Sequence, residues 1–188
     1  VSPSEFLPGA LTDLSSEPMR PAKDFYRPLA VGAPEPIREI PFPPSRMIHF
    51  FPPSNDKMRS KVPEIAPTVD ILLANLEYGV PADQKEAARA GLVEVAQIPS
   101  FAADFGDTQF WTRVNSLDSP WGLDDLTAAV LEAGEALDVI MIPKVEGPED
   151  IHYVDRLLAQ LEAKAGLTEP LLVHAILETA RGVANVEE

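Results

Sequence analysis

Residues 171–188, LLVHAILETARGVANVEE, join a continuous apolar run to a glutamate and then to a short segment of helical character. The apolar run ends at Leu177, and Glu178 follows it directly. A short run of this kind is typical of a strand that is buried on both faces, as in parallel sheets. In such sheets, functional groups collect where strands end and loops begin. The stretch therefore predicts a buried parallel strand that delivers a carboxylate to a functional edge.

Similar apolar runs occur upstream, and helical stretches alternate with them. The runs cover residues 47–51, 69–76, 109–114 and 139–142. Helices are predicted from Pro81 to about Gln97, from Leu123 to about Leu137, and from Pro148 to Lys164, with Asp83 or a neighbour as a cap for the first. Runs that recur at intervals of roughly 20 to 40 residues indicate βα units and a parallel α/β fold. This pattern alone fits both an open doubly wound sheet and part of a (β/α)8 barrel.

Composition narrows the class of protein. The net charge is -15, so nucleic acid and anionic membrane surfaces are poor partners. The 188 residues include no cysteine, which excludes disulfides and thiolate chemistry within them. The apolar runs are far shorter than the roughly 20 residues of a membrane helix, and no signal peptide is recognisable at the start. We therefore expect a globular, cytoplasmic protein that binds neither nucleic acid nor membranes.

The N-terminal part of the chain has a different character. Residues 1–45 hold many prolines, from Pro3 to Pro44. Because proline fixes φ and removes a backbone donor, regular helix or sheet is not expected there. Apolar residues such as Tyr26 and Ile37 indicate that this arm packs against a folded body. We predict a proline-rich arm over residues 1–45 and an α/β domain over residues 46–188.

Polar side chains follow every predicted strand. They are Lys57 and Arg59 after the first strand, Glu77 after the second, Arg113 in the third, Lys144 after the fourth and Glu178 after the fifth. Because the carboxyl ends of parallel strands meet at one edge, these groups are expected to share that edge. Carboxylates and water suit Mg²⁺, and arginine can hold a carboxylate with two hydrogen bonds. The set permits metal-assisted chemistry on an anionic carbonyl compound, although helix caps and mutual ion pairs are alternatives for the same side chains.

Neither the histidines nor the common sequence motifs indicate a second catalytic or binding site. His49 and His174 fall within predicted strands and His152 within a helix, so packing or a single hydrogen bond is expected for each. The sequence contains no GxGxxG, P-loop, HExxH or GxSxG motif. Nucleotide-binding and serine-hydrolase chemistry therefore have no support in the motifs.

Several segments together resemble the HpcH/HpaI aldolase and citrate lyase β-subunit superfamily, and within it the malyl-CoA lyases. The segments are FFPP (50–53), LANLE (73–77) with VPADQKEAAR (80–89), WTRVNSLDSPW (111–121), LDVIMIPKVEGPEDI (137–151) and HAILETARGVANVEE (174–188). The likeness runs from about Asp24 to the last residue. It implies a TIM-type (β/α)8 barrel, of which this chain holds about the first five βα units. Residues 46–188 would then be the N-terminal part of a barrel lyase domain.

The resemblance also implies an activity. Family members of this kind cleave malyl-CoA or β-methylmalyl-CoA reversibly to acetyl-CoA or propionyl-CoA and glyoxylate, with Mg²⁺ or alternatively Mn²⁺. They assemble as homo-trimers or homo-hexamers. Glu178 matches the family's first metal ligand, and Arg113 matches the arginine that contacts substrate and steadies the enolate. A second metal-ligand aspartate is expected beyond residue 188.

Other positions match the family's binding residues. Phe51 matches a residue at the CoA-ester pocket, and Lys57 and Arg59 lie where basic residues meet the CoA phosphates. Lys144 matches the lysine of the PKV motif and, with Glu77, is assigned to the structure of the site. These roles are implied by the resemblance alone.

Two departures from the family pattern keep alternatives open. The family reads LED at the end of the second strand, whereas Tyr78 follows Glu77 here. The chain also stops after roughly five-eighths of a barrel, so we expect it to be part of a longer protein. The alternatives on the same fold are a citryl-thioester lyase, a malyl-CoA thioesterase and a pyruvate-type aldolase. A truncated or degenerate member that binds CoA esters, or only pairs with another subunit, is the non-catalytic alternative.

Overall fold

A parallel sheet forms the centre of the structure, a computed structural model that describes residues 28–37, 39–40, 44–98 and 107–187. Its strands are β1 (Ile48–Phe51), β2 (Ile71–Asn75), β3 (Gln109–Arg113), β4 (Val139–Ile142) and β5 (Leu172–Ala175). They lie in the order β1-β2-β3-β4-β5, and each neighbouring pair is parallel. All five predicted strands are therefore present, with ends that differ from the predictions by at most two residues.

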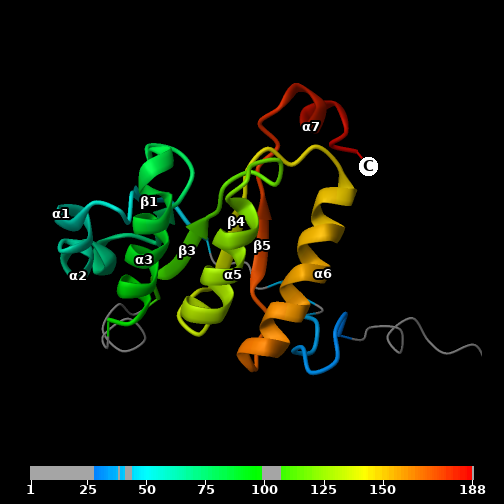
Figure 1. The fold of residues 1–188 in the computed structure, drawn as a ribbon, viewed down its shortest axis with the longest axis horizontal. Coiled ribbons are helices and arrows are strands. Elements are labelled where there is room, and N and C mark those ends of the chain that lie inside the picture. Colours follow the sequence, from blue (N-terminus) through cyan, green and yellow to red (C-terminus); the bar gives the residue numbers. More distant parts are fainter. Residues whose placement is uncertain (1–27, 38, 41–43, 99–106, 188) are drawn as a thin grey trace, which may run out of the picture.

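The order of the strands separates the two architectures that the sequence pattern left open. In a doubly wound sheet the strand order reverses at a switch point and helices cover both faces. Here the order never reverses, and the helices α3 (Lys85–Ala96), α5 (Gly122–Ala133) and α6 (Pro148–Ala165) lie side by side on one face (Figure 1). This is the arrangement of successive βα units in a barrel, which confirms the predicted partial TIM-type barrel.

The helix ends differ in instructive ways from the expectations. No side chain caps α3, which begins after a 3-10 turn at η3 (Ala82–Gln84), so the cap expected at Asp83 or a neighbour is wrong. α5 ends at Ala133 because the chain turns at Gly134 rather than continuing to Leu137. α6 begins at Pro148 and ends before Gly166, whose φ of 75° closes the helix in the left-handed conformation that glycine adopts freely.

Short helices complete the described part of the chain. They are α1 (Asp56–Arg59), α2 (Val62–Ile65), the 3-10 turn η2 (Ala66–Thr68) and α7 (Ala180–Ala184). The first three connect β1 to β2, and α7 is the helical segment expected after Glu178. Among the helices of the described residues, none has the length and apolar character that a membrane crossing requires.

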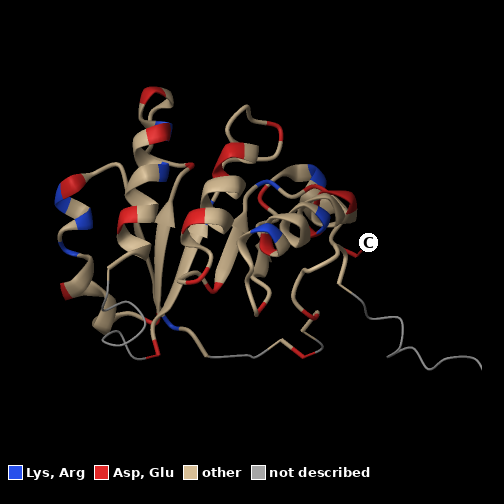
Figure 2. Cartoon of the chain, turned by 60° about the horizontal axis from the view of Figure 1, so that its bottom comes forward, with Lys and Arg blue, Asp and Glu red and all other residues tan. Residues whose placement is uncertain are grey.

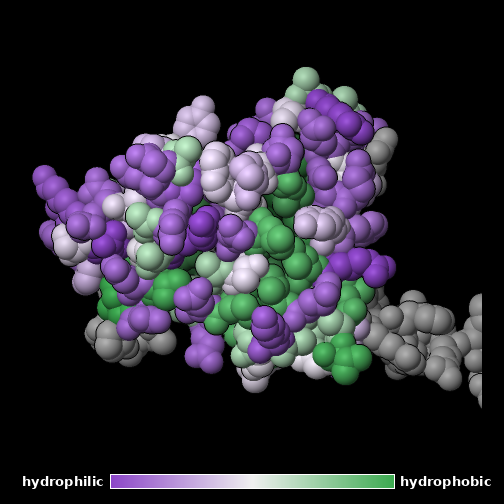
Figure 3. Space-filling model, in the orientation of Figure 1, coloured by the Kyte–Doolittle hydropathy of each residue, from purple (hydrophilic) through white to green (hydrophobic). Residues whose placement is uncertain are grey.

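Apolar side chains pack on both faces of the sheet. The larger cluster fills the space between the sheet and the helices and includes Leu72, Phe110, Ile140, Leu92 and Leu126. A smaller cluster on the opposite face is formed by Ile71, Leu73, Trp111, Val139 and Met141. Figure 3 shows the outer side, where polar residues cover the helices and apolar residues are visible between α5 and α6. The near-continuous apolar strands therefore reflect burial on two faces, as the sequence predicts.

The described part of the proline-rich arm contains a turn between Ala30 and Ala33 but neither helix nor strand. Ile37 lines a cavity of about 470 Å³ with Leu137, Leu167 and Leu172 at the amino-terminal edge of the sheet. The described residues of the arm therefore contact the α/β body, while Tyr26 and residues 1–27 lie outside the described residues. The domain boundary at residue 45 stays a prediction.

Candidate functional site

Three charged residues from three consecutive strand ends meet at the carboxyl edge of the sheet. Glu77 follows β2, Arg113 ends β3 and Lys144 follows β4. Nζ of Lys144 donates a hydrogen bond to Oε1 of Glu77. Nε of Arg113 lies 3.4 Å from Oε2 of the same carboxylate. One carboxylate therefore holds two cations together at the edge where βα folds place their chemistry.

This carboxylate is well shielded from solvent. The Glu77 side chain is 9% exposed and that of Arg113 is 12% exposed, whereas that of Lys144 is 43% exposed. Oε2 of Glu77 is buried and has no hydrogen-bond partner among the described residues. The hydrogen bond to Glu77 raises the pKa of Lys144 above its usual value, and the negative charges of Glu178 and Asp118 add to this. Lys144 therefore stays an ammonium ion in this site at neutral pH.

Arg113 is fixed at one end of its guanidinium group and free at the other. Its Nε donates a hydrogen bond of 2.9 Å to Oδ1 of Asn75. The rings of Phe50 and Tyr78 flank the group, with centroids 5.4 and 5.7 Å from the central carbon. The two terminal nitrogens have no hydrogen-bond partner among the described residues. The planar fork is therefore available to an anion, the geometry in which arginine binds carboxylates.

The backbone at Lys144 is also unusual. Its φ is 54°, and Lys144 is the only non-glycine among the described residues with a positive φ. A side chain in this left-handed region costs on the order of 1 kcal/mol, and such residues cluster at functional sites. The strained turn lets the lysine reach Glu77 from beyond β4.

A second, buried layer of polar residues supports Glu77, and the sequence analysis missed it. Lys85, the first residue of α3, is 5% exposed and donates hydrogen bonds to the carbonyl oxygens of Leu76 (2.7 Å) and Glu77 (2.9 Å). It also donates to Oδ1 of Asn115 at 2.6 Å. Lys85 lies within the segment VPADQKEAAR at the start of a helix, where a lysine is usually exposed, so its spacing gives little sign of a buried role.

The same layer continues into α5. Nδ2 of Asn115 donates to Oδ2 of Asp125 at 2.5 Å, and the backbone N–H of Asn115 donates to the same oxygen at 2.8 Å. Arg89 pairs with the other Asp125 oxygen at 3.0 Å. The signal for these residues in the sequence is weak, because polar residues within helices are usually exposed. Only the packing of α3 and α5 on the sheet shows that they point inward.

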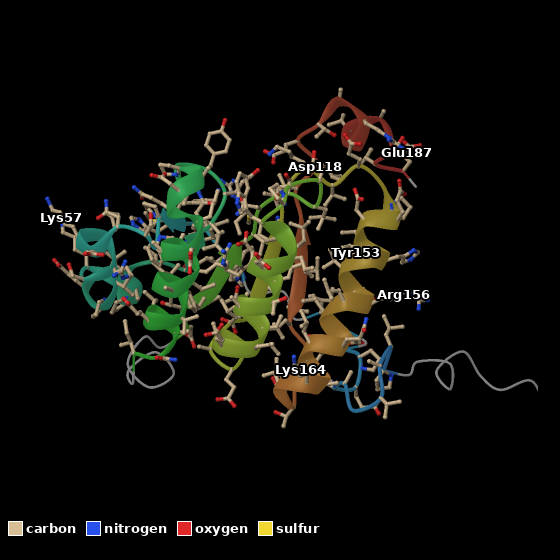
Figure 4. All side chains as sticks on the ribbon, viewed as in Figure 1. Lys57, Asp118, Tyr153, Arg156, Lys164 and Glu187 are labelled. Atoms are coloured by element: carbon tan, nitrogen blue, oxygen red, sulfur yellow. The ribbon has the colours of Figure 1, made fainter. Side chains whose placement is uncertain are left out.

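Glu178 follows β5 at the carboxyl edge of the sheet, and its role as a metal ligand stays a prediction. It is exposed between β5 and α7, and its charge contributes to the raised pKa of Lys144. Thr179 begins α7 and accepts a hydrogen bond of 2.9 Å from the backbone N–H of Gly182. In Figure 4, Asp118 lies at the end of the molecule that carries α7. A cavity of about 380 Å³ opens beside this edge and is lined by Glu77, Lys85 and Lys144 among others.

Three predicted binding residues lie apart from this cluster. Phe51 is 1% exposed in the core between sheet and helices, so its side chain does not face the site, whereas the adjacent Phe50 does. The alternation of side chains along a strand explains the difference. Arg59 is engaged within the fold, with bonds to the Pro53 carbonyl (2.6 Å), Asp56 (2.8 Å) and Glu94 (2.9 Å). Its placement therefore argues against the predicted contact with CoA phosphates.

Lys57 is the predicted phosphate contact that remains available. It is exposed on α1 and projects from the end of the molecule opposite α7 (Figure 4). Figure 2 shows basic residues beside acidic ones at the end of the molecule that holds α1 and α2. The role of Lys57 in binding CoA stays a prediction.

The donor set fits magnesium bound mainly through water and substrate. Among the described residues, no three acidic or histidine side chains are grouped so as to hold a metal ion. Glu178 offers one exposed carboxylate beside the network of Glu77. Mg²⁺ commonly takes only one or two protein carboxylates and keeps several waters. Glu178 could supply one such carboxylate, and this role stays a prediction.

Comparison with known proteins gives this geometry a family. Residues 46–188 match the family model for HpcH/HpaI aldolase/citrate lyase. The chain belongs to this family. It is 58% identical over 167 residues to the malyl-CoA/β-methylmalyl-CoA/citramalyl-CoA lyase of Chloroflexus aurantiacus, covering 89% of this chain and 47% of that protein. It is 36% identical over 148 residues to an L-malyl-CoA/β-methylmalyl-CoA lyase of Cereibacter sphaeroides, covering 79% of this chain and 45% of that protein.

A solved structure of the same kind supports the fold. CitE from Mycobacterium tuberculosis, in complex with magnesium and acetate, matches with a TM-score of 0.53 and 26% identity. The match covers 75% of this chain and 48% of that one. The chain thus spans about half the length of the family relatives it matches.

Proposed function

We propose that this chain supplies part of the active site of a Mg²⁺-dependent CoA-ester lyase. The reaction is the reversible cleavage of malyl-CoA or β-methylmalyl-CoA to acetyl-CoA or propionyl-CoA and glyoxylate. The names of the two lyase relatives support this substrate class. The observation that carries the proposal is the free guanidinium fork of Arg113, held by Glu77 and Asn75 at the edge that Glu178 also reaches.

The chemistry of the cleavage explains why these groups suit it. The hydroxyl group of the substrate loses its proton to a base and becomes the carbonyl of glyoxylate as the carbon–carbon bond breaks. The acyl thioester is left as an enolate, with negative charge on its oxygen, until its carbon takes up a proton. Glu178 would hold the Mg²⁺ ion, which would supply Lewis-acid chemistry at a substrate oxygen. The terminal N–H groups of Arg113 are positioned to stabilise the oxygen on which charge develops. Because Nε is fixed by Asn75, this donor pair is oriented before substrate binds.

Glu77 and Lys144 have supporting roles in this proposal. Glu77 restrains Arg113, and Lys144 offsets the charge of Glu77 through their hydrogen bond. A lone carboxylate beside the enolate oxygen would repel the developing charge. The paired carboxylate therefore orients the arginine without opposing the reaction.

The proposal is tested by assaying glyoxylate release from L-malyl-CoA with Mg²⁺ and with excess EDTA. We expect turnover that requires the metal, and R113Q is expected to lower kcat/KM about 100-fold or more because it removes transition-state donors. The matched control is R156Q, which removes an exposed arginine on α6 (Figure 4) and should leave turnover unchanged. The intact mass of the assayed protein, compared with the 20.4 kDa of the 188 residues, identifies the species measured.

Product analysis separates the alternatives. Free malate and CoA without glyoxylate indicate a thioesterase, oxaloacetate from citryl-CoA indicates a citryl-thioester lyase, and pyruvate from a free hydroxy-keto acid indicates an aldolase. CoA-ester binding without any metal-dependent turnover would support the non-catalytic alternative and overturn the lyase proposal.

The assembly and location are further parts of the proposal. By its family resemblance, we propose a homo-trimer or homo-hexamer that acts in the cytoplasm. Light scattering coupled to size-exclusion chromatography measures the assembly directly, and a monomer at micromolar concentration would contradict it.

A further inference from the structure

We propose that Lys85 is a positioning residue for this site. Its buried ammonium holds the backbone just after β2, which carries Glu77, and Glu77 in turn orients Arg113. The inference rests on the proposed lyase function and assigns a role to a residue at the start of α3, outside the strand ends. Lys85 borders the cavity at this edge, but its ammonium is directed to protein acceptors. Its effect is exerted through the backbone of residues 76–77.

The hydrogen bonds of Lys85 account for all its donors. An ammonium group has three N–H bonds, and Lys85 directs them to the carbonyl oxygens of Leu76 and Glu77 and to Oδ1 of Asn115. The three distances lie between 2.6 and 2.9 Å. No donor is left for a substrate, so Lys85 cannot bind one without breaking this arrangement.

The two carbonyl groups lie at the point where the sheet ends. β2 ends at Asn75, so Leu76 and Glu77 follow the last residue of the strand. The N–H of Leu76 still bonds to the carbonyl of Arg113 at 2.9 Å, whereas the carbonyls of Leu76 and Glu77 are held by Lys85. Nδ2 of Asn115 also donates to the Leu76 carbonyl at 3.1 Å, and the N–H of Glu77 donates to Oδ1 of Asn75 at 3.1 Å. Lys85 thus helps to fix the backbone of Glu77 and binds its carbonyl, and the Glu77 carboxylate in turn contacts Arg113 and Lys144.

The charges around Lys85 indicate that its ammonium has a role that an apolar side chain could not fill. Burying a cation is costly unless it is paired, and an apolar side chain would fill the same space without that cost. Asp125 and Glu77 supply negative charge, and the ring of Trp121 lies 5.3 Å from Nζ. The nearby cations Arg113 and Lys144 oppose the charge of Lys85. Lys85 is therefore buried although two other cations lie nearby. The hydrogen bonds that it directs to the site explain why a lysine occupies this position.

The test is a double-mutant cycle on the purified protein with K85M, E77Q and K85M/E77Q. We expect K85M to lower kcat for malyl-CoA cleavage about 10- to 100-fold, the usual effect of losing a supporting partner in such a site. KM should change by less than about threefold, because the ammonium of Lys85 has no donor left for a substrate. If Lys85 acts through Glu77, adding K85M to E77Q should cost less than about threefold further, whereas independent effects would multiply.

A second readout does not depend on catalysis. In protein labelled with ¹⁵N-arginine, the Nε–H resonance of Arg113 reports its contacts with Asn75 and Glu77. We expect this resonance to move in both K85M and E77Q. The matched control is E162Q, which alters a buried charge that accepts a backbone N–H at 2.8 Å at the other end of the sheet, and should leave the resonance in place.

The outcomes separate the two proposals. Absence of turnover in wild-type protein overturns the lyase function, while the Arg113 resonance still decides the role of Lys85. A lower melting temperature in K85M with unchanged resonance and kcat would show that Lys85 only stabilises the fold. If K85M does not fold, K85Q replaces it, because its shorter amide has only two donors and must lose at least one of the three hydrogen bonds; wild-type kcat and an unmoved resonance in K85Q would likewise overturn the inference.

Discussion

Lys144 donates a hydrogen bond to Glu77 although 67 residues separate them in the chain. The strands that they follow, β4 and β2, are not neighbours, because β3 lies between them. The left-handed turn at Lys144 carries its ammonium across the end of β3, where Arg113 lies. The carboxylate thus receives a cation from each of the next two strands.

We predict that K144M lowers turnover about tenfold or more, because Glu77 is then paired with Arg113 alone and its charge beside the developing enolate is less well compensated. K144R restores a cation and should recover part of the loss. K164M is the matched control, since Lys164 is an exposed lysine in the last turn of α6 (Figure 4). Steady-state kinetics with malyl-CoA checks the prediction, and equal losses in K144M and K164M would contradict it.

Tyr78 follows Glu77, and its ring lies 5.7 Å from the guanidinium carbon of Arg113. We predict that Y78A raises KM about two- to fivefold, the loss of one exposed cation–π contact that keeps the arginine in place. Y78F keeps the ring and is the control. The side chain is 75% exposed, so the melting temperature should not change in either variant. An equal KM effect in both variants would assign the role to the hydroxyl group instead.

The buried carboxyl group of Glu162 makes the stability of the fold depend on pH. Burial raises the pKa of Glu162, although the hydrogen bond from Leu171 opposes the shift. Because the folded state then binds this proton more tightly than the unfolded state, stability falls as pH rises from the unfolded pKa through the folded pKa. E162Q removes the charge and keeps an acceptor. Its gain in melting temperature over the wild type should grow between about pH 4 and pH 8, and thermal melts across that range measure it.

E132Q is the control for this pH dependence, because Glu132 is exposed on α5. Its melting temperature should follow that of the wild type at every pH. A constant difference between E162Q and the wild type would mean that the titration of Glu162 does not contribute.

Gly91 provides a test of the packing between α3 and β1. A Cβ atom added there would lie 2.0 Å from the carbonyl oxygen of Pro53, a contact that requires the backbone to move. We predict that G91A destabilises the fold by about 1–3 kcal/mol through overpacking, which exceeds the helix propensity that alanine adds. Denaturant unfolding measures the change. A90S, at the exposed neighbouring position, should stay within about 0.5 kcal/mol of the wild type.

The sequence analysis succeeded where one local property decided the outcome. Apolar runs predicted the positions of β2 and β4. Pro148 marks the start of α6, and Gly166 lies just past its end. It was less successful where the outcome depended on the direction in which a side chain points. Phe50 and Phe51 are adjacent and chemically identical, but side chains alternate between the two faces of a strand. Only Phe50 therefore lies on the side of Arg113.

The sequence by itself determined the βα succession, the acidic character of the chain and the charged residues at the strand ends, because periodicity, composition and spacing are local properties. Only the tertiary structure decided that Glu77 would bind two cations and that Lys85 would be buried beneath it. These relationships join segments 8 to 67 residues apart. They depend on how the strands pair and how α3 packs, which no single stretch of sequence specifies.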